Sequence, residues 1–136
     1  MKALLTSVLL LITTTVFAQD ENIHALLQEQ IAAFNGRNID ALTANVSEDF
    51  KWYYIGTDSL FLEVSGKGQF RNNMESYFES IAEVKSEIAE YTIDNNRISF
   101  KEVVEYTTAS GQTGKASAMG IYEVKDGLIF RAWYFL

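Results

Sequence analysis

Three ionisable residues lie among apolar neighbours and are the first candidates for chemistry: Glu63, Glu102 and Arg131. Glu102 stands two residues from both Phe100 and Val104, and side chains alternate along a strand, so these three share one face. A buried carboxylate is unfavourable unless it is paired or binds something. We therefore predict Glu102 as a candidate catalytic carboxylate. The alternative is a surface ion pair between Glu102 and Arg131 or a lysine.

Aromatic and polarisable side chains are the second group of candidates, because ligand pockets are mainly apolar with a few polar groups. The hydroxyls of Tyr77 and Tyr106 would be able to donate hydrogen bonds to a ligand oxygen. The alternative is an ordinary aromatic core, and Trp133, in the middle of its segment, is predicted to be buried. The predicted ligand-binding residues are Trp52, Tyr54, Tyr77, Tyr106, Met119 and Arg131.

The residue inventory excludes several kinds of site. The sequence has no cysteine, so it contains no Cys nucleophile. Its single histidine, His24, lies near the mature N-terminus at the edge of the first helix's apolar stripe, so we expect no Ser-His-Asp triad. A zinc site needs several closely spaced N or S ligands, and no calcium-loop motif occurs. We predict no metal, no cofactor and no disulfide.

The elements that must position these residues follow from a change in hydrophobic period. Apolar side chains at three- and four-residue spacing predict a helix from about residue 22 that ends at Gly36, which is expected to take the left-handed conformation. Asn38 is expected to cap a second helix. Residues 47–49 should end that second helix. The remaining pattern predicts strands at 50–55 and 60–64, a third helix after the 65–68 loop that includes Ile81, and strands at 86–94, 97–109, 115–124 and 128–136, with Asn95-Asn96 in a hairpin turn.

This order places helices mainly in the first half of the chain and antiparallel strands in the second. Each helix has one apolar stripe, so the helices should cover one face of a sheet. The predicted fold is α+β: a cone-shaped, curved antiparallel sheet of about six strands covered by three helices from the N-terminal half. A curved sheet closed by helices encloses an interior that can serve as a site.

Residues 1–18 have the features of a signal peptide: a positive start, a short apolar core and small residues before the expected cleavage site. The apolar core is shorter than the roughly 20 residues of a membrane span, and an N-terminal anchor is the alternative. Residues 19–136 are then one domain of an exported protein, periplasmic or extracellular and from a bacterium. The formal charge of −7 disfavours nucleic acid, and membrane contact after cleavage, as partners.

Four motifs in order carry a resemblance to a known superfamily: residues 34–42, 47–52, 66–70 and 126–129, the last leading into Trp133-Tyr134. The chain resembles the nuclear transport factor 2-like superfamily, which includes ketosteroid isomerase and the SnoaL-like polyketide cyclases. The resemblance spans nearly all of residues 23–136 and implies the cone-shaped fold.

The resemblance also allows the catalytic residues of ketosteroid isomerase to be compared with this sequence position by position. Those isomerases use an Asp base, with a Tyr and a protonated Asp as oxyanion donors. An ungapped comparison places the base near Tyr54, the donor Tyr near Gln30 and the donor Asp near Gly120. None of the three matches, so a steroid-isomerase reaction is not expected.

Three functions remain open from the sequence. The first is an exported protein that binds a small hydrophobic molecule in an apolar cone. The second is a SnoaL-like isomerase, cyclase or dehydratase that uses a carboxylate general base. The third is a non-catalytic interaction module that forms a homodimer through its sheet face. A deep pocket with an inward carboxylate of raised pKa would favour an enzyme.

Overall fold

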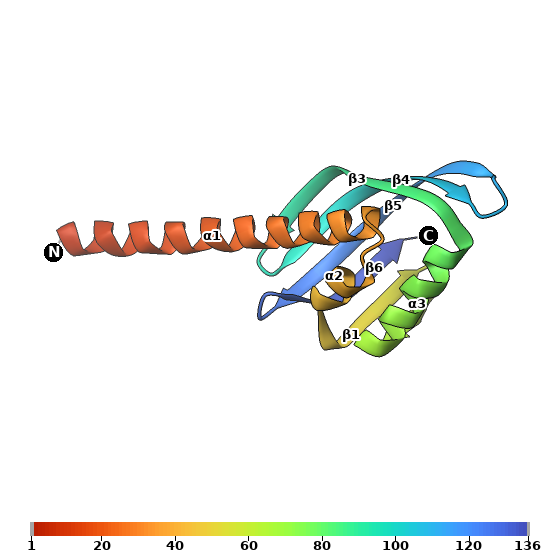
Figure 1. Cartoon of the computed structure of the whole chain (residues 1–136). Coiled ribbons are helices and arrows are strands. Elements are labelled where there is room, and N and C mark those ends of the chain that lie inside the picture. The colour runs from red at the N-terminus through yellow and green to blue at the C-terminus, as the bar shows by residue number, and fades with distance from the viewer. Residues whose placement is uncertain (1, 136) are drawn as a thin grey trace.

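The computed structural model describes the backbone of residues 2–135 and the side chains of residues 17–135. Within this range three helices and six strands follow one another in the predicted order (Figure 1). They are α1 (Lys2–Asn35), α2 (Ile39–Ala44), β1 (Val46–Ile55), β2 (Leu60–Ser65), α3 (Lys67–Ser80), β3 (Ile81–Asp94), β4 (Arg97–Thr108), β5 (Thr113–Lys125) and β6 (Leu128–Phe135).

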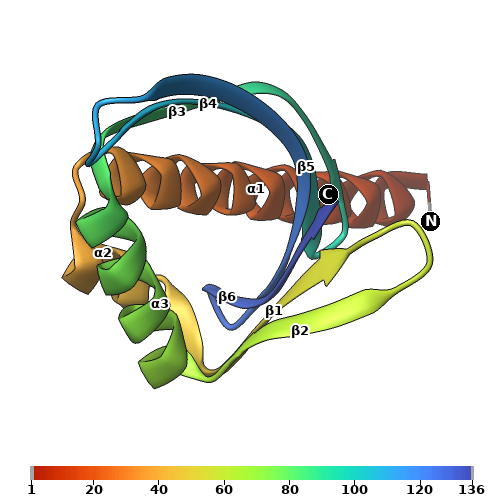
Figure 2. The ribbon, with the colours of Figure 1, turned by 90° about the vertical axis from the view of Figure 1, so that its right-hand side faces the viewer.

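The six strands form one sheet in the order β2-β1-β6-β5-β4-β3. Neighbours are antiparallel except β1 and β6, which are parallel. The C-terminal strand therefore lies in the middle of the sheet, between β1 and β5. Figure 2 shows the sheet curving around an interior, with the helices on its hollow side. The predicted fold class, α+β with a six-stranded curved sheet and helices in the N-terminal half, is confirmed.

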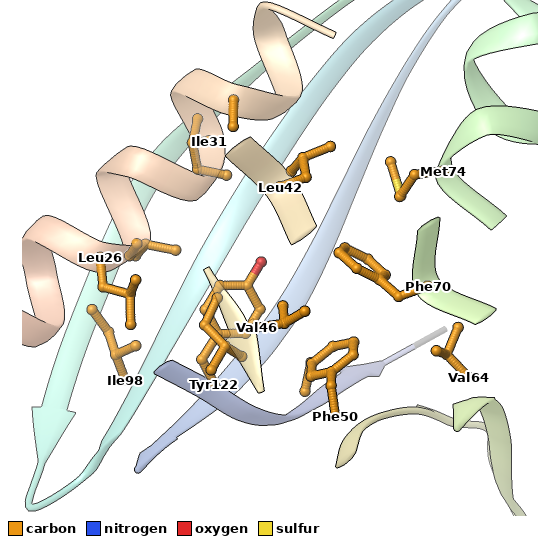
Figure 3. Close-up of a cluster of buried hydrophobic side chains, with 14 of the residues drawn as sticks. Leu26, Ile31, Leu42, Val46, Phe50, Val64, Phe70, Met74, Ile98 and Tyr122 are labelled. Carbon is orange, nitrogen blue, oxygen red and sulfur yellow. The ribbon is translucent and has the colours of Figure 1, made fainter. Parts of the chain in front are cut away.

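The core lies between the hollow face of the sheet and the helices. Leu27 from α1, Leu42 from α2 and Ile98 from β4 are each 2% exposed or less. Figure 3 shows side chains from all three helices and from the sheet converging on this interior. Burial of apolar surface at this meeting point holds the helices over the sheet.

Helix α1 is continuous from Lys2 to Asn35, and its N-terminal part projects beyond the sheet (Figure 1). The side chains of residues 1–16, and with them most of the predicted signal peptide 1–18, lie outside the described residues. In the part of the chain that the structure describes, no helix combines the length and the apolar character needed to cross a membrane.

The end of α1 differs in detail from the prediction. The residue with left-handed backbone is Arg37 (φ 53°) rather than Gly36. The guanidinium of Arg37 donates hydrogen bonds to the carbonyls of Ile81 and Ala82, both at 2.8 Å, and to that of Phe78. These bonds offset the unfavourable backbone conformation of a non-glycine residue. Asn38 caps α2 as predicted, with its side chain accepting from the backbone N–H of Ala41 at 3.0 Å.

Two strands begin earlier than their local sequence indicates. β1 starts at Val46, so residues 47–49 lie inside a strand instead of in the predicted break. Val46 pairs with Ile129 of β6, and the Ile129 N–H donates to the Asn45 carbonyl at 2.9 Å. Ile81 is the first residue of β3 rather than the last of α3, and it pairs with Thr108. Pairing with distant strands thus overrides local propensity at both places.

Candidate ligand-binding cavity

A cavity of about 520 Å³ lies between the hollow face of the sheet and the helices. We call this face of the sheet the inner face; paired residues Trp52, Ala132, Tyr122 and Ile98 form one row across it. Each helix contributes apolar side chains to the wall: Ile31 and Phe34 from α1, Leu42 from α2, and Phe70 and Met74 from α3. Most of the wall is apolar, and a few polar groups are grouped on the strands.

Glu102 is the buried carboxyl group of the cavity wall. It is 7% exposed, lines the cavity from β4 and accepts a hydrogen bond from the Ser86 hydroxyl on β3. Burial raises its pKa because the ionised form loses its hydration, and hydrogen bonds from Ser86 and Tyr134 oppose part of that rise. Glu102 thus points inward, and the alternative of a surface ion pair with Arg131 is wrong, because Arg131 pairs with Glu123 at 2.9 Å.

The Glu102 carboxyl is positioned by a chain of contacts that begins on α1. The Asn35 side chain donates to the Ser86 carbonyl at 2.9 Å and accepts from the Ser86 N–H at 2.6 Å. The Asn35 side chain thus bonds both the N–H and the carbonyl of Ser86, as the backbone of a residue in an adjacent strand would at this edge of the sheet. These two bonds hold Ser86, which is 1% exposed, so that its hydroxyl meets the carboxyl.

Two tyrosines from the C-terminal strands complete the polar group. The hydroxyls of Tyr122 on β5 and Tyr134 on β6 lie 3.2 Å apart, and Tyr134 also hydrogen-bonds Glu102. Burial is the largest cause that raises the pKa of both phenols, and the charge of Glu102 adds to it. Both tyrosines stay protonated and serve as donors.

Three of the six predicted ligand-binding residues line the cavity. Trp52 and Tyr54 project from β1, and Tyr77 projects from α3. Burial raises the pKa of both tyrosines, and neighbouring carboxylates raise it further: Glu63 and Glu102 for Tyr54, and Glu102 for Tyr77. The structure therefore brings these three residues together with Glu102, although they come from distant parts of the sequence.

The other three predicted residues lie elsewhere. Tyr106 lines a separate hollow with Val84, and its ring covers Gly114 so closely that an added Cβ would fall 2.5 Å from it. It belongs to the inward-facing set by alternation, but it lies beyond the reach of the cavity along β4.

Met119 and Arg131 alternate with inward residues and so lie on the outer face of the sheet. Met119 is 60% exposed. The guanidinium of Arg131 lies 5.0 Å from the centre of the Phe130 ring and 5.5 Å from that of Trp133. Trp133 is partly buried on the outer face, with its ring stacked on that of Tyr53 at 6.0 Å between ring centres, and it lies outside the hydrophobic core.

Glu63, a candidate for chemistry that was not placed in the predicted catalytic or ligand-binding set, lines the cavity, and so do Tyr122 and Tyr134, which that set also lacked. Glu63 is the extra residue of a β-bulge: Trp52 pairs with Val64 and Tyr53 with Leu62, which leaves Glu63 unpaired. A bulge redirects a side chain, and here the exposed Glu63 lines the cavity. Tyr134 stands two residues from Ala132, and Tyr122 stands two residues from Gly120, so each pair shares one face of its strand. This spacing was the sequence signal that could have identified the two tyrosines.

The positions compared with ketosteroid isomerase carry other groups. Gln30 lines the cavity, but its side chain is engaged with Asn45 at 2.9 Å and with the Leu42 carbonyl at 3.4 Å. Gly120 is packed against Phe100 and Tyr134. Among the described residues no group of three or more His, Asp or Glu side chains is placed to hold a metal ion. The buried carboxyl of this cavity is Glu102, which pairs with Ala118, two residues from Gly120 on β5.

Comparisons with known proteins agree with this architecture. The family model of the SnoaL-like domain matches residues 27–132. A putative polyketide cyclase from Xanthomonas campestris is 21% identical, with a TM-score of 0.67, covering 87% of this chain and 92% of its own. No curated protein matches the sequence.

Two further solved structures share the fold. A putative SnoaL-like polyketide cyclase from Jannaschia sp. has a TM-score of 0.71 at 13% identity, covering 85% of each chain. An epoxide hydrolase of the LEH-like type from M. tuberculosis has a TM-score of 0.69 at 13% identity, covering 85% of this chain and 82% of its own. At such identities these likenesses establish the fold alone.

Proposed function

The chain belongs to the SnoaL-like domain family, and we propose that its residues 19–136 form an exported domain that binds a small hydrophobic molecule. The observation that carries this proposal is the cavity of about 520 Å³ with apolar walls and a few grouped polar side chains. Binding pockets for small molecules have volumes of roughly 300–1,000 Å³ and the same division between apolar wall and polar handles.

The size of the cavity argues against a packing defect. Protein interiors are close-packed, with few voids larger than a water molecule. When an apolar ligand replaces the water in contact with the apolar side chains around such a volume, the free energy of the system falls. The hydroxyls of Tyr54 and Tyr77 and the Glu102 carboxyl then orient the ligand.

A second candidate function is an enzyme in which Glu102 moves a proton. The buried carboxyl of raised pKa that faces the cavity favours it, since general acids and bases have pKa values near the working pH. Glu102, as a carboxylate, would accept a proton from one substrate atom and, as the neutral acid so formed, return it to another. The Tyr134 hydroxyl would stabilise the carboxylate before the first step and after the second.

The test is mass spectrometry of small molecules retained by the natively purified protein, combined with a variant that fills the cavity. Ala118 lines the cavity, and its neighbour Met119 lies on the outer face. We expect the wild type and the control Met119→Phe to retain the same apolar molecule, and Ala118→Phe to lose it while remaining folded. Equal retention by all three proteins, or retention by none, would reject the cavity as a binding site.

The enzyme candidate is tested with the molecule so identified. Glu102→Gln keeps the shape of the side chain and removes the proton-accepting oxygen. Turnover by the wild type that is lost in Glu102→Gln supports catalysis, and binding without conversion in both proteins leaves a binding protein.

A further inference from the structure

Two carboxyl groups and no basic side chain line the cavity. Among the residues whose side chains the structure describes, the lining includes Glu63 and Glu102 but no Lys, Arg or His. The chain is also acidic as a whole, with a formal charge of −7. An anionic ligand such as a carboxylate would therefore enter without a positive partner, which is unfavourable in an apolar enclosure.

One cationic side chain close enough to affect the site, that of Arg37, is directed away from the cavity. Arg37 lowers the pKa of Tyr77 by its charge, but its guanidinium is bound to the carbonyls at the end of α3 and the start of β3. Its ring contact is with Phe78, at 5.2 Å, and Phe78 is not part of the cavity wall. The Arg37 guanidinium thus binds backbone carbonyl groups and does not line the cavity.

The two carboxyl groups occupy different depths. Glu102 is almost fully buried, whereas Glu63 is exposed at the point where the bulge in β2 turns it toward the cavity. Both carboxyl groups affect Tyr54. Burial raises the pKa of the Tyr54 hydroxyl, and the charges of Glu63 and Glu102 raise this pKa further. Where these two carboxyl groups are ionised, they attract positive charge to this wall.

Aromatic rings cover the wall between the carboxyl groups. The ring of Trp52 lies 5.3 Å from that of Tyr54, 5.7 Å from that of Tyr134 and 6.4 Å from that of Phe70. All four residues line the cavity. Aromatic rings attract cations through their quadrupole, most strongly where water is excluded, and sites for quaternary ammonium groups are built in this way.

We propose that the ligand is a small lipophilic cation, an amine or quaternary ammonium group on an apolar body. The charged group lies against Trp52, Tyr54 and Tyr134, between Glu63 and Glu102, and the apolar body fills the space under the helices. This inference rests on the proposed function, because it names the ligand class of the same cavity. The cation supplies the partner that the ionised Glu102 otherwise lacks.

Three probes of nearly equal shape and different charge test the ligand class. They are phenyltrimethylammonium, its neutral isostere tert-butylbenzene, and the anion 2-methyl-2-phenylpropanoate, each measured by equilibrium dialysis. At about pH 8, where carboxyl groups of ordinary pKa are ionised, we expect the cation to bind about tenfold more tightly than the neutral isostere. The anion should bind more weakly than either.

Matched variants locate the source of the preference. Glu63→Gln leaves an exposed position polar, so its fold is not at risk, and Glu102→Gln removes the deeper charge. Each should reduce the preference for the cation by about threefold or more. Glu79→Gln, which removes one charge from an exposed position on α3 outside the cavity, should leave the preference unchanged.

The outcomes separate this inference from the proposed function. If the neutral probe or the anion binds as tightly as the cation, the cavity remains a binding site and the ligand class is wrong. The same holds if neither Glu63→Gln nor Glu102→Gln alters the preference. If no probe binds and no molecule is retained on purification, both the ligand class and the binding function fail.

Discussion

At the scale of single residues, the site depends on one carboxyl group kept in an apolar interior. Glu102 has hydrogen-bond donors in Ser86 and Tyr134, yet the loss of hydration outweighs them and its pKa is raised. Burial therefore disfavours the ionised form of Glu102 relative to an exposed carboxyl group. Glu102 thus links the charge of the cavity to the stability of the fold.

This linkage predicts how Glu102→Gln alters the pH dependence of stability. Below its ordinary pKa of 4.5, Glu102 is neutral in the folded and unfolded states alike. As the pH rises through the raised folded pKa, the wild type loses stability that the neutral Gln variant keeps. The advantage of the variant at high pH should exceed that at low pH by about 1.4 kcal/mol for each unit of pKa shift.

Urea denaturation of both proteins at about pH 4 and about pH 8 measures this difference. Glu83→Gln, at an exposed position on β3, is the control, and its stability should follow that of the wild type at both pH values. Parallel behaviour of Glu102→Gln and wild type would show that Glu102 ionises as readily in the folded protein as in the unfolded chain.

At the scale of elements, the central strands leave room for the rings that form the polar group. Gly120 on β5 faces Phe100 on β4 and Tyr134 on β6. A Cβ at this position would lie 2.6 Å from the Phe100 ring and 3.1 Å from the Tyr134 ring. The glycine is required here by close packing and not by its backbone conformation.

We accordingly predict that Gly120→Ala destabilises the protein by about 1–3 kcal/mol, as overpacking of a core does. It should also weaken ligand retention, because Tyr134 has to move away from Glu102. Gly68→Ala is the contrast: nothing lies within 4 Å of its Cβ, and it lies inside α3. That change should stabilise the protein by about 0.5–1 kcal/mol through helix propensity.

Thermal or urea unfolding of the two variants decides between these expectations. Gly120→Ala and Gly68→Ala make the same chemical change, and the two positions differ only in their surroundings. A Gly120→Ala protein as stable as Gly68→Ala would mean that β4 and β6 adjust freely around β5.

At the scale of the whole molecule, the two faces of the sheet are chemically different. The inner face holds the cavity, and the outer face exposes large apolar side chains that include Leu62 and Met119. Exposed apolar groups that gather on one face mark interaction sites. A homodimer through this face therefore stays a prediction, and a monomeric mass in analytical ultracentrifugation would reject it.

Export is also a property of the whole chain. Expressed in a bacterial host with its N-terminus intact, the protein should be cleaved after Ala18, because residues 16–18 end the apolar segment with small side chains at the positions that signal peptidase reads. Intact-mass analysis of the exported fraction should give a chain that begins at Gln19. A mass that retains residues 1–18 would favour the anchor.

The sequence by itself determined those features that depend on neighbours along the chain. Hydrophobic period predicted the order of helices and strands, since each period is a local property of the backbone. Alternation along β4 placed Glu102 with Phe100 and Val104, and the structure has all three on the inner face. The motifs between residues 34 and 134 indicated the family whose model matches residues 27–132.

Only the tertiary structure decided which face of each strand is the inner one and how far the cavity extends. Local alternation cannot show that Met119 and Arg131 lie outside, or that Tyr106 lies beyond the cavity wall. The parallel pairing of β6 with β1 brings Tyr134 toward Trp52, and the bulge in β2 turns Glu63 inward. Both depend on contacts between residues far apart in sequence, and these form only when the whole sheet closes around its core.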